Sequence, residues 1–313
     1  MVETLFYILV FPGFVFLSSL SFITEFVDRK LYARFQNRAG PPFIQPLADF
    51  LKLVGKEDVI PEDSSPAIFK FMPILALTAV LTAFAYIPLW TTHGLASFQG
   101  DIIVLLYLLT IPTLTFFLAG WYSTSLYAKI GAVRTITQLF AYEVPLFMAV
   151  LACAILADSW KTADIAAFYS AKPWLILVNL PAMFVALIAL LGKLERVPFD
   201  IPEAETEIVA GTFTEYSGRL LALFRLGINI ETIVAASLLA AVMIPFGLGL
   251  PWWFGVPLYL AKILFVIFCL ALLRSVFARF RIDQMMRFCW TVLAPIAFFQ
   301  IILNLIIKGF VLK

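Results

Sequence analysis

The chain is long, strongly apolar and poor in charge. Of its 313 residues, 63% are hydrophobic and 13% are charged, and the mean hydropathy is +0.99. A soluble protein of this length needs more charge to cover its surface, so the composition excludes a soluble globular protein. The net charge of +2 reflects Lys and Arg in a few loops and gives no support to nucleic-acid binding.

Apolar runs long enough to cross a bilayer recur along the chain. Each is predicted to be a helix, because backbone groups inside lipid must pair within their own segment. The expected fold class is an all-α integral membrane protein, a single membrane domain over residues 1–313 with about eight transmembrane helices. In chain order the expected spans are Leu5–Thr24, Phe69–Trp90, Ile102–Ser123, Ile136–Ala157, Trp174–Leu194, Leu220–Leu248, Phe254–Phe277 and Phe288–Ile307.

Lys and Arg concentrate in the loops after the first, third, fifth and seventh spans, and Lys193 is counted among these loop residues. The loop after the fourth span holds only Lys161 and Lys172. Because basic loops remain in the cytoplasm, both termini are expected outside. The first span lacks a basic flank and a cleavage site and is interpreted as a retained helix. The cytoplasmic segments, about residues 28–66, 193–218 and 277–287, are expected to dock a partner.

The first of these segments contains a helical pattern of its own. Apolar residues recur at helical spacing, with charged residues on the other side, which predicts a short amphipathic helix at the interface or under a partner. The apolar positions are Phe43, Ile44, Leu47, Phe50, Leu51 and Val54.

Metal-binding and dinucleotide motifs are missing from the sequence. Cys153, Cys269 and Cys289 are isolated, and His93 is the only histidine. We therefore expect this chain to bind no cofactor and to contain no metal site, so that any redox chemistry lies on a partner.

Several charges fall inside the apolar runs. Glu143, Glu231 and Lys262 lie within expected spans, where a charge costs on the order of 2.5–3.5 kcal/mol. Each is therefore a candidate for ion transfer, and the plainer alternative is a structural ion pair inside the bundle. Arg225 and Arg274, near helix ends, are expected to reach the membrane interface.

The acidic stretch "RVPFDIPEAETEIVAGTFTEYSG" carries Asp200, Glu203, Glu205, Glu207 and Glu215 between two apolar runs. If it is helical, Asp200, Glu203 and Glu207 share one face and titrate as a coupled set, which suits a proton-loading site. The alternative is an acidic loop that is solvated or docked on a basic partner.

The same stretch resembles the most specific motif of a membrane subunit shared by respiratory complex I, as its H-type subunit or NADH:quinone oxidoreductase subunit 1, and the energy-converting nickel–iron hydrogenases. "DRKLYARFQNRAGP", "QPLADFLKLVGKED", "LAGWYSTSLYAKIGAVRTITQLFAYEV" and "RFRIDQMM" match further blocks of that family in order, so the resemblance covers essentially the whole chain.

The resemblance implies a position where the membrane arm meets the redox arm, in the cell membrane of a prokaryote. It places Glu143 and the five acids of the stretch in an acidic funnel. In the mechanism that we favour, Lys262 or Glu231 then relays the electrostatic change to neighbouring membrane subunits. It assigns the remaining candidates to docking and cavity loops: Asp28, Arg29, Arg34, Arg38, Asp49, Arg274, Arg279, Arg281 and Asp283.

Two departures favour the hydrogenase-type branch. The loop "GPPFIQP" is shorter than in complex I relatives, and "LFRLGINIE" has Ile228 where those relatives carry Glu. The leading hypothesis is a membrane-anchor subunit without catalytic residues, which docks a redox module and couples electron transfer to proton or sodium translocation. The complex is then a hydrogenase or a ferredoxin-linked, sulfur-reducing relative.

The resemblance also implies the partners: hydrogenase-like large and small subunits, which hold the nickel–iron centre and iron–sulfur clusters, and antiporter-like membrane subunits. Two alternatives stay open. One is the quinone-site subunit of complex I, and the other is a stand-alone ion-coupled secondary transporter, although no repeat typical of transporters is found.

Overall fold

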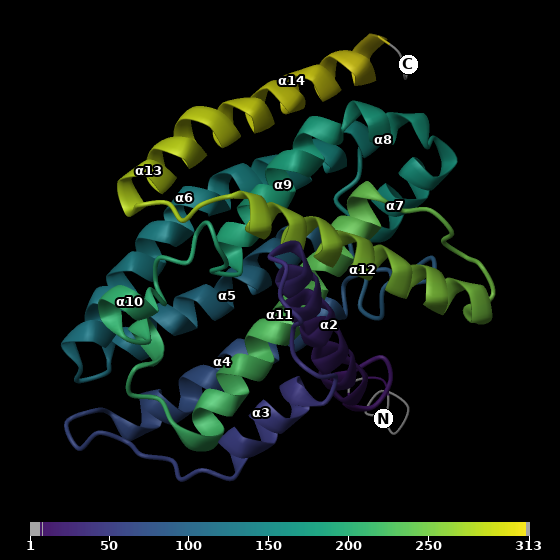
Figure 1. The fold of residues 1–313 in the computed structure, drawn as a ribbon. Coiled ribbons are helices and arrows are strands. Elements are labelled where there is room, and N and C mark those ends of the chain that lie inside the picture. The colour runs from purple at the N-terminus through teal and green to yellow at the C-terminus, as the bar shows by residue number, and fades with distance from the viewer. Residues whose placement is uncertain (1–6, 8, 311–313) are drawn as a thin grey trace.

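The computed structural model describes residues 7 and 9–310, and only the backbone at Glu205 and Thr206. These residues form helices and no strand, as expected for an all-α membrane protein (Figure 1). Six described segments are long and apolar enough to cross a bilayer. They are α4 (Pro66–Phe84), α5 (Asp101–Trp121), α6 (Leu126–Ala157), α11 (Gly218–Met243), α12 (Trp252–Val276) and Ile282–Phe310, which comprises α13 (Ile282–Phe288), the π-helical turn η2 (Cys289–Leu293) and α14 (Ala294–Phe310).

Two other helices stand where the remaining spans were expected. Helix α2 (Phe14–Phe35) begins later than Leu5–Thr24 and continues through residues expected in a loop, and the first residues of that expected span lie outside the described part of the chain. Ion pairs hold part of the extension: Asp28 pairs with Arg196, and Arg29 pairs with Asp49. The span Trp174–Leu194 is broken at Asn179 into α8 (Trp174–Val178) and the shorter apolar helix α9 (Leu180–Lys193).

Helix α11 runs through the middle of the molecule, beside α2 and α4 (Figure 1). In its most apolar stretch 89% of the residues are buried within the protein, against 33% in α12 and 28% in Ile282–Phe310. A central helix can carry polar side chains because protein groups, rather than lipid, surround them. This position allows α11 to contain Asn229 and Glu231.

Helix α14 is held against α6 by buried amide groups, which we call the amide clasp: Asn179, Gln300 and Asn304. Asn304 Nδ2 donates to Asn179 Oδ1 and to the Ala152 carbonyl, at 2.8 Å each. Gln300 Nε2 donates to Asn179 Oδ1 at 3.2 Å, and Asn179 Nδ2 donates to the Tyr169 hydroxyl at 2.8 Å. Polar groups inside a membrane protein must find such internal partners.

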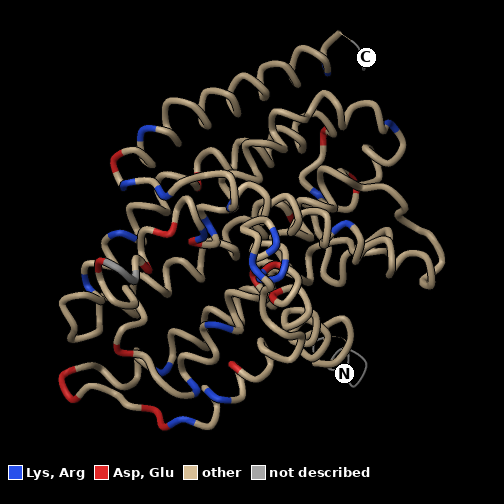
Figure 2. Tube along the Cα trace, in the orientation of Figure 1, with Lys and Arg blue, Asp and Glu red and all other residues tan. Residues whose placement is uncertain are grey.

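Helix α3 (Gln45–Val54) confirms the expected amphipathic helix. Phe50 and Leu53 face the interior, whereas Ile44 and Leu51 are exposed. Most charged residues lie on the side of α3, α10 and the start of α13, and the side with α8 and the end of α14 carries few (Figure 2). Helix α2 begins at the lower right of the view and α14 ends at the upper right (Figure 1).

The prediction of a helical acidic stripe is wrong. Between Pro198 and Gly218 only α10 (Glu205–Ile208) and the 3-10 turn η1 (Gly211–Phe213) are helical, so Asp200 and Glu203 lie in coil. The segment folds closely over α6 instead. A Cβ at Gly131 would lie 2.7 Å from the Thr212 nitrogen, and one at Gly211, where φ is +54°, would lie 1.8 Å from the Pro202 oxygen.

Candidate functional site

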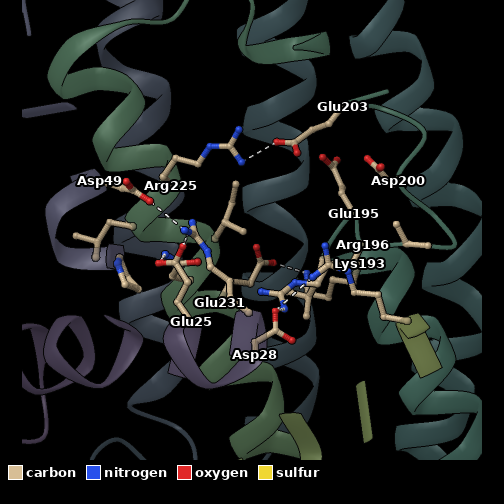
Figure 3. Close-up of a pocket in the computed structure, with 18 of the residues that line it drawn as sticks. Glu25, Asp28, Asp49, Lys193, Glu195, Arg196, Asp200, Glu203, Arg225 and Glu231 are labelled. Carbon is tan, nitrogen blue, oxygen red and sulfur yellow. Dashed lines mark hydrogen bonds and ion pairs between the residues drawn. The ribbon is translucent and has the colours of Figure 1, made fainter. Parts of the chain in front are cut away.

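A cavity of about 580 Å³ lies between α2, α3, α11 and the segment that follows α9. Carboxylates and cations line it together with a smaller apolar part, and Figure 3 shows the charged side chains converging on it from these elements. The charged residues are Glu25, Asp28, Arg29, Asp49, Lys193, Glu195, Arg196, Asp200, Glu203, Arg225, Glu231, Arg274 and Arg279.

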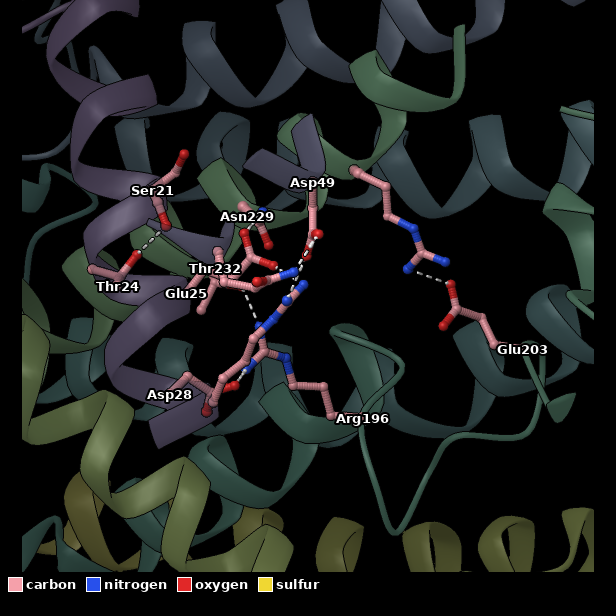
Figure 4. Close-up of polar contacts among 12 residues, drawn as sticks. Ser21, Thr24, Glu25, Asp28, Asp49, Arg196, Glu203, Asn229 and Thr232 are labelled. Atoms are coloured by element: carbon pink, nitrogen blue, oxygen red, sulfur yellow. Dashed lines mark hydrogen bonds and ion pairs between the residues drawn. The ribbon is translucent and has the colours of Figure 1, made fainter. Parts of the chain in front are cut away.

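Asp28 is the junction between three elements. Its Oδ2 accepts from Arg196 Nη1 at 2.6 Å and from Arg274 Nη1 at 3.4 Å (Figure 4). The Arg274 guanidinium also lies 4.2 Å from the centre of the Tyr32 ring. Arg274 therefore faces the cavity, and the expectation that it reaches the membrane interface is wrong. These bonds tie the start of the acidic segment to α2 and α12.

Arg225 is likewise drawn to the cavity, where it pairs with Glu203 at 3.0 Å and lies 5.7 Å from the Phe213 ring centre. On the other side of the cavity Arg29 pairs with Glu25 and, at 2.9 Å, with Asp49. The charged residues that line the cavity thus form ion pairs that hold α2, α3 and α11 around it.

Glu195 and Glu207 lie in opposite surroundings. Burial, together with the negative charges of Glu203, Glu231 and Asp200, raises the pKa of Glu195 well above its usual value. Glu207 is exposed at the surface, where a hydrogen bond of 2.7 Å from Arg134 lowers its pKa. The segment therefore contains a carboxyl group that favours its protonated form and one that favours its ionised form.

Lys193 and Glu231 form a deeply buried ion pair. Their side chains are 2% and 1% exposed, and Lys193 Nζ lies 2.7 Å from Glu231 Oε1. Lys193 also donates to the Leu109 carbonyl of α5. Lys193 was expected in a cytoplasmic loop, and that expectation is corrected. Its contact with Glu231 is an ion pair inside the bundle, the plainer alternative that the sequence offered for Glu231.

Glu143 and Lys262, the other charges within spans, are both half-buried. Glu143 lies on α6 within electrostatic range of Lys193. Lys262 lies on α12 and forms no ion pair with any described residue. The structure therefore brings Glu143 and Glu231 to one lysine and leaves Lys262 apart from them.

The other predicted site residues lie mostly at the charged surface. Arg34, Arg38, Arg281 and Asp283 are exposed, and Glu215 is half-buried. Arg279 donates to the Asp200 carbonyl, so it holds the acidic segment beside the last cytoplasmic loop. The side chain of Glu205 lies outside the described part.

Several cavity residues were missing from the sequence-based candidates: Glu25, Lys193, Glu195, Arg196, Arg225 and Asn229. Glu25 fell between the first expected span, which ends at Thr24, and the cytoplasmic segment that begins at about residue 28, and Lys193 looked like an ordinary basic residue after a span. Glu231 offered a usable signal for its partner. A buried carboxylate requires a cation, and the sequence contains only a few Lys and Arg residues that could supply it.

Comparison with known proteins places this site in a family. The family model described as NADH dehydrogenase matches residues 7–305. The chain belongs to this family. The H-type subunit of the NADH-quinone oxidoreductase of Dehalococcoides mccartyi is 36% identical over 315 residues, covering 99% of this chain and 87% of the relative. NADH-quinone oxidoreductase subunit 8 of Thermus thermophilus is 36% identical over 301 residues, covering 90% and 80%.

A solved structure agrees with the family assignment. A chain from the membrane-bound sulfane sulfur reductase, an archaeal respiratory membrane complex, superposes with a TM-score of 0.84 and 28% identity, covering 93% of this chain and 96% of that one. The resemblance found in the sequence is confirmed: this is a multi-pass membrane subunit of the H type. Within the described residues no group of three or more His, Cys, Asp or Glu is placed to hold a metal ion.

Proposed function

We propose that this chain anchors a cytoplasmic redox module of the hydrogenase type or a ferredoxin-linked, sulfur-reducing relative, and couples its electron transfer to proton or sodium translocation. In this proposal the large and small subunits of the module hold the nickel–iron centre and the iron–sulfur clusters, and antiporter-like subunits lie alongside in the membrane. The likeness to the sulfane sulfur reductase supports this branch, as does the short loop "GPPFIQP".

One observation carries the coupling role: titratable groups lead from the cavity into the bundle. Glu195 lies at the cavity and interacts electrostatically with Glu231, which pairs with Lys193, and Lys193 interacts with Glu143 on α6. Titratable groups kept inside a membrane protein at such cost mark ion pathways. A change of charge in the docked module would alter the protonation of the cavity acids and move charge along this path.

Glu143→Gln tests this function in the purified complex reconstituted in vesicles. It preserves size and polarity but removes titration, so ion uptake driven by reduced ferredoxin should fall by roughly 10²–10⁴-fold. Electron transfer from reduced viologen and assembly on native gels should remain. Glu207→Gln, at the exposed acid paired with Arg134, is the matched control. Normal uptake by Glu143→Gln would count against the coupling role.

A second candidate is quinone reduction at the cavity. The relatives at 36% identity are subunits of NADH-quinone oxidoreductases, and Phe22, Phe50 and Leu53 give the cavity an apolar side. Quinone extracted in stoichiometric amount from the purified complex, together with quinone-dependent electron transfer, would favour this candidate over the hydrogenase-type branch.

A further inference from the structure

The ammonium group of Lys193 lies where four helices meet. Lys193 is the last residue of α9, Glu231 comes from α11, the Leu109 carbonyl comes from α5, and Glu143 comes from α6. Figure 3 shows Lys193 and Glu231 facing each other, with Glu195 on the side of Lys193. A single cation thus has one carboxylate in contact and a second within electrostatic range.

Local packing fixes the ammonium group at this place. A Cβ at Gly192 would lie 3.0 Å from Tyr142 Cβ, so the glycine allows the end of α9 to approach α6 closely. Gln138 Nε2 donates to the Gly192 carbonyl at 2.7 Å, which satisfies a carbonyl in the last turn of α9. The bond from Lys193 to Leu109 holds the side chain from a third direction.

A purely structural role does not explain the Lys193–Glu231 ion pair. Replacing a buried ion pair by neutral residues of similar size is often harmless to stability, so stability alone does not explain a fully buried lysine and glutamate. The position of the pair between the cavity and Glu143 suggests a role in transfer.

We propose that Lys193 is the positioning residue that couples the arrival of a proton at Glu231 to the release of a proton from Glu143; this rests on the function proposed above. At the start Glu231 is ionised and Glu143 holds a proton. A proton leaves Glu195 for Glu231, which becomes neutral. Lys193 keeps its three protons but loses its counter-ion, so its charge favours the ionised form of Glu143.

The proton of Glu143 then passes to water or to a carboxylate or amine of a neighbouring membrane subunit. One proton has entered and one has left, and the summed charge of Glu231, Lys193 and Glu143 is unchanged. Each transfer breaks one O–H bond and forms one O–H bond, or one N–H bond where an amine accepts the proton. Tyr142, whose hydroxyl lies 3.0 Å from Thr113 Oγ1 and within electrostatic range of Glu231 and Glu143, lies beside this step.

The deciding experiment compares Lys193→Met, Lys193→Arg and the double variant Lys193→Met/Glu231→Gln in the intact complex. We expect Lys193→Met to retain viologen-driven electron transfer and to lose ferredoxin-driven ion uptake by on the order of 10²-fold. The double variant removes the unpaired charge and should assemble well, yet its uptake should stay as low. Lys193→Arg, which keeps the cation, should restore part of the uptake.

Uptake by the double variant at the wild-type rate would overturn the proposal, because a neutral pair would then serve equally well. Failure of both neutral variants to assemble, with normal assembly of Lys193→Arg, would also overturn it and leave the pair a structural one. The wild type and Glu143→Gln, measured in the same vesicles, distinguish a failure of the proposal for Lys193 from a failure of the proposed coupling function. If the wild type takes up no ions, the proposed function itself fails.

Discussion

Glu195 and Glu207 belong to the same cytoplasmic segment, yet the structure gives them different proton affinities. Glu195 has its Oε1 shut away from solvent without a hydrogen-bond partner among the described residues, and its surroundings are rich in carboxylates. Glu207 lies in the open beside Arg134. The two side chains should therefore lose their protons in different pH ranges, Glu195 in the higher one and Glu207 in the lower one.

Carbodiimide labelling tests this difference, because a carbodiimide reacts with a protonated carboxyl group. Since the pKa of Glu195 is raised, its labelling should be strong at about pH 6 and decline as the pH rises through that raised value. The pKa of Glu207 is lowered from about 4.3, so Glu207 should stay ionised and unlabelled over the same range. Peptide mass spectrometry gives both extents in one sample.

Glu195→Gln identifies the labelled site and should abolish its signal. Equal labelling of Glu195 and Glu207 at about pH 6 would contradict the assignment of opposite proton affinities.

At the residue scale the sequence predicted which side chains were unusual better than it predicted their partners. Glu143 and Glu231 stood out because a charge in an apolar run is costly. The partner of Glu231 was not readable, since Lys193 reaches it only through the packing of α9 between α5, α6 and α11. Thirty-eight positions separate the two residues, and nothing in the local pattern links them.

At the scale of elements, the acidic segment is shaped by where it touches α6. The backbone at Gly211 and Thr212 lies so close to Gly131 that no side chain fits between them. Gly131→Val should therefore push η1 off α6, at a cost of about 1–3 kcal/mol. The complex should show a lower melting temperature and faster proteolysis within residues 198–217.

Gly227→Ala is the matched control on α11. A Cβ at Gly227 meets nothing within 4 Å, so alanine should be neutral or stabilise the helix by up to about 1 kcal/mol. If Gly131→Val and Gly227→Ala gave the same melting temperature and proteolysis pattern, the close contact would not be what holds the segment.

The elements that the sequence predicted well are those governed by periodicity. Helix α3 follows from its amphipathic pattern, and the long apolar helices follow from the need to satisfy the backbone in lipid. The path of residues 198–217 depends instead on contacts with distant parts of α6 and of the loop after α12. The helical pattern of acids there was misleading because Pro202 lies between Asp200 and Glu203, and only Glu205–Ile208 is α-helical.

At the scale of the whole molecule, the charges gather on the side that holds α3, α10 and the start of α13 (Figure 2). We expect this side to dock the redox module, so charge reversal of exposed Arg281 should weaken its attachment and lower the salt concentration that releases it. Lys172→Glu, at an exposed lysine just after α7 (Thr162–Ala171), is the control. Native gels over a salt series measure attachment of the module in both variants. Equal loss of attachment in the two variants would count against docking on this side.

The amide clasp also bears on how the protein is made. Helix α14 leaves the ribosome after α6, α8 and α9. The side-chain amides of Gln300 and Asn304 enter the lipid with no partner in the backbone hydrogen bonds of their own helix. Their acceptors, Asn179 Oδ1 and the carbonyls of Ala152 and Val178, exist only once α6 and the junction of α8 with α9 are in place. In a misassembled bundle Gln300 can still donate to Asn304 Oδ1 within α14, but both amides lose the acceptors supplied by α6, α8 and Asn179. The clasp thus gives biogenesis a checkpoint, because the lost acceptors are a mark by which quality control can distinguish a misassembled bundle from a correctly assembled one.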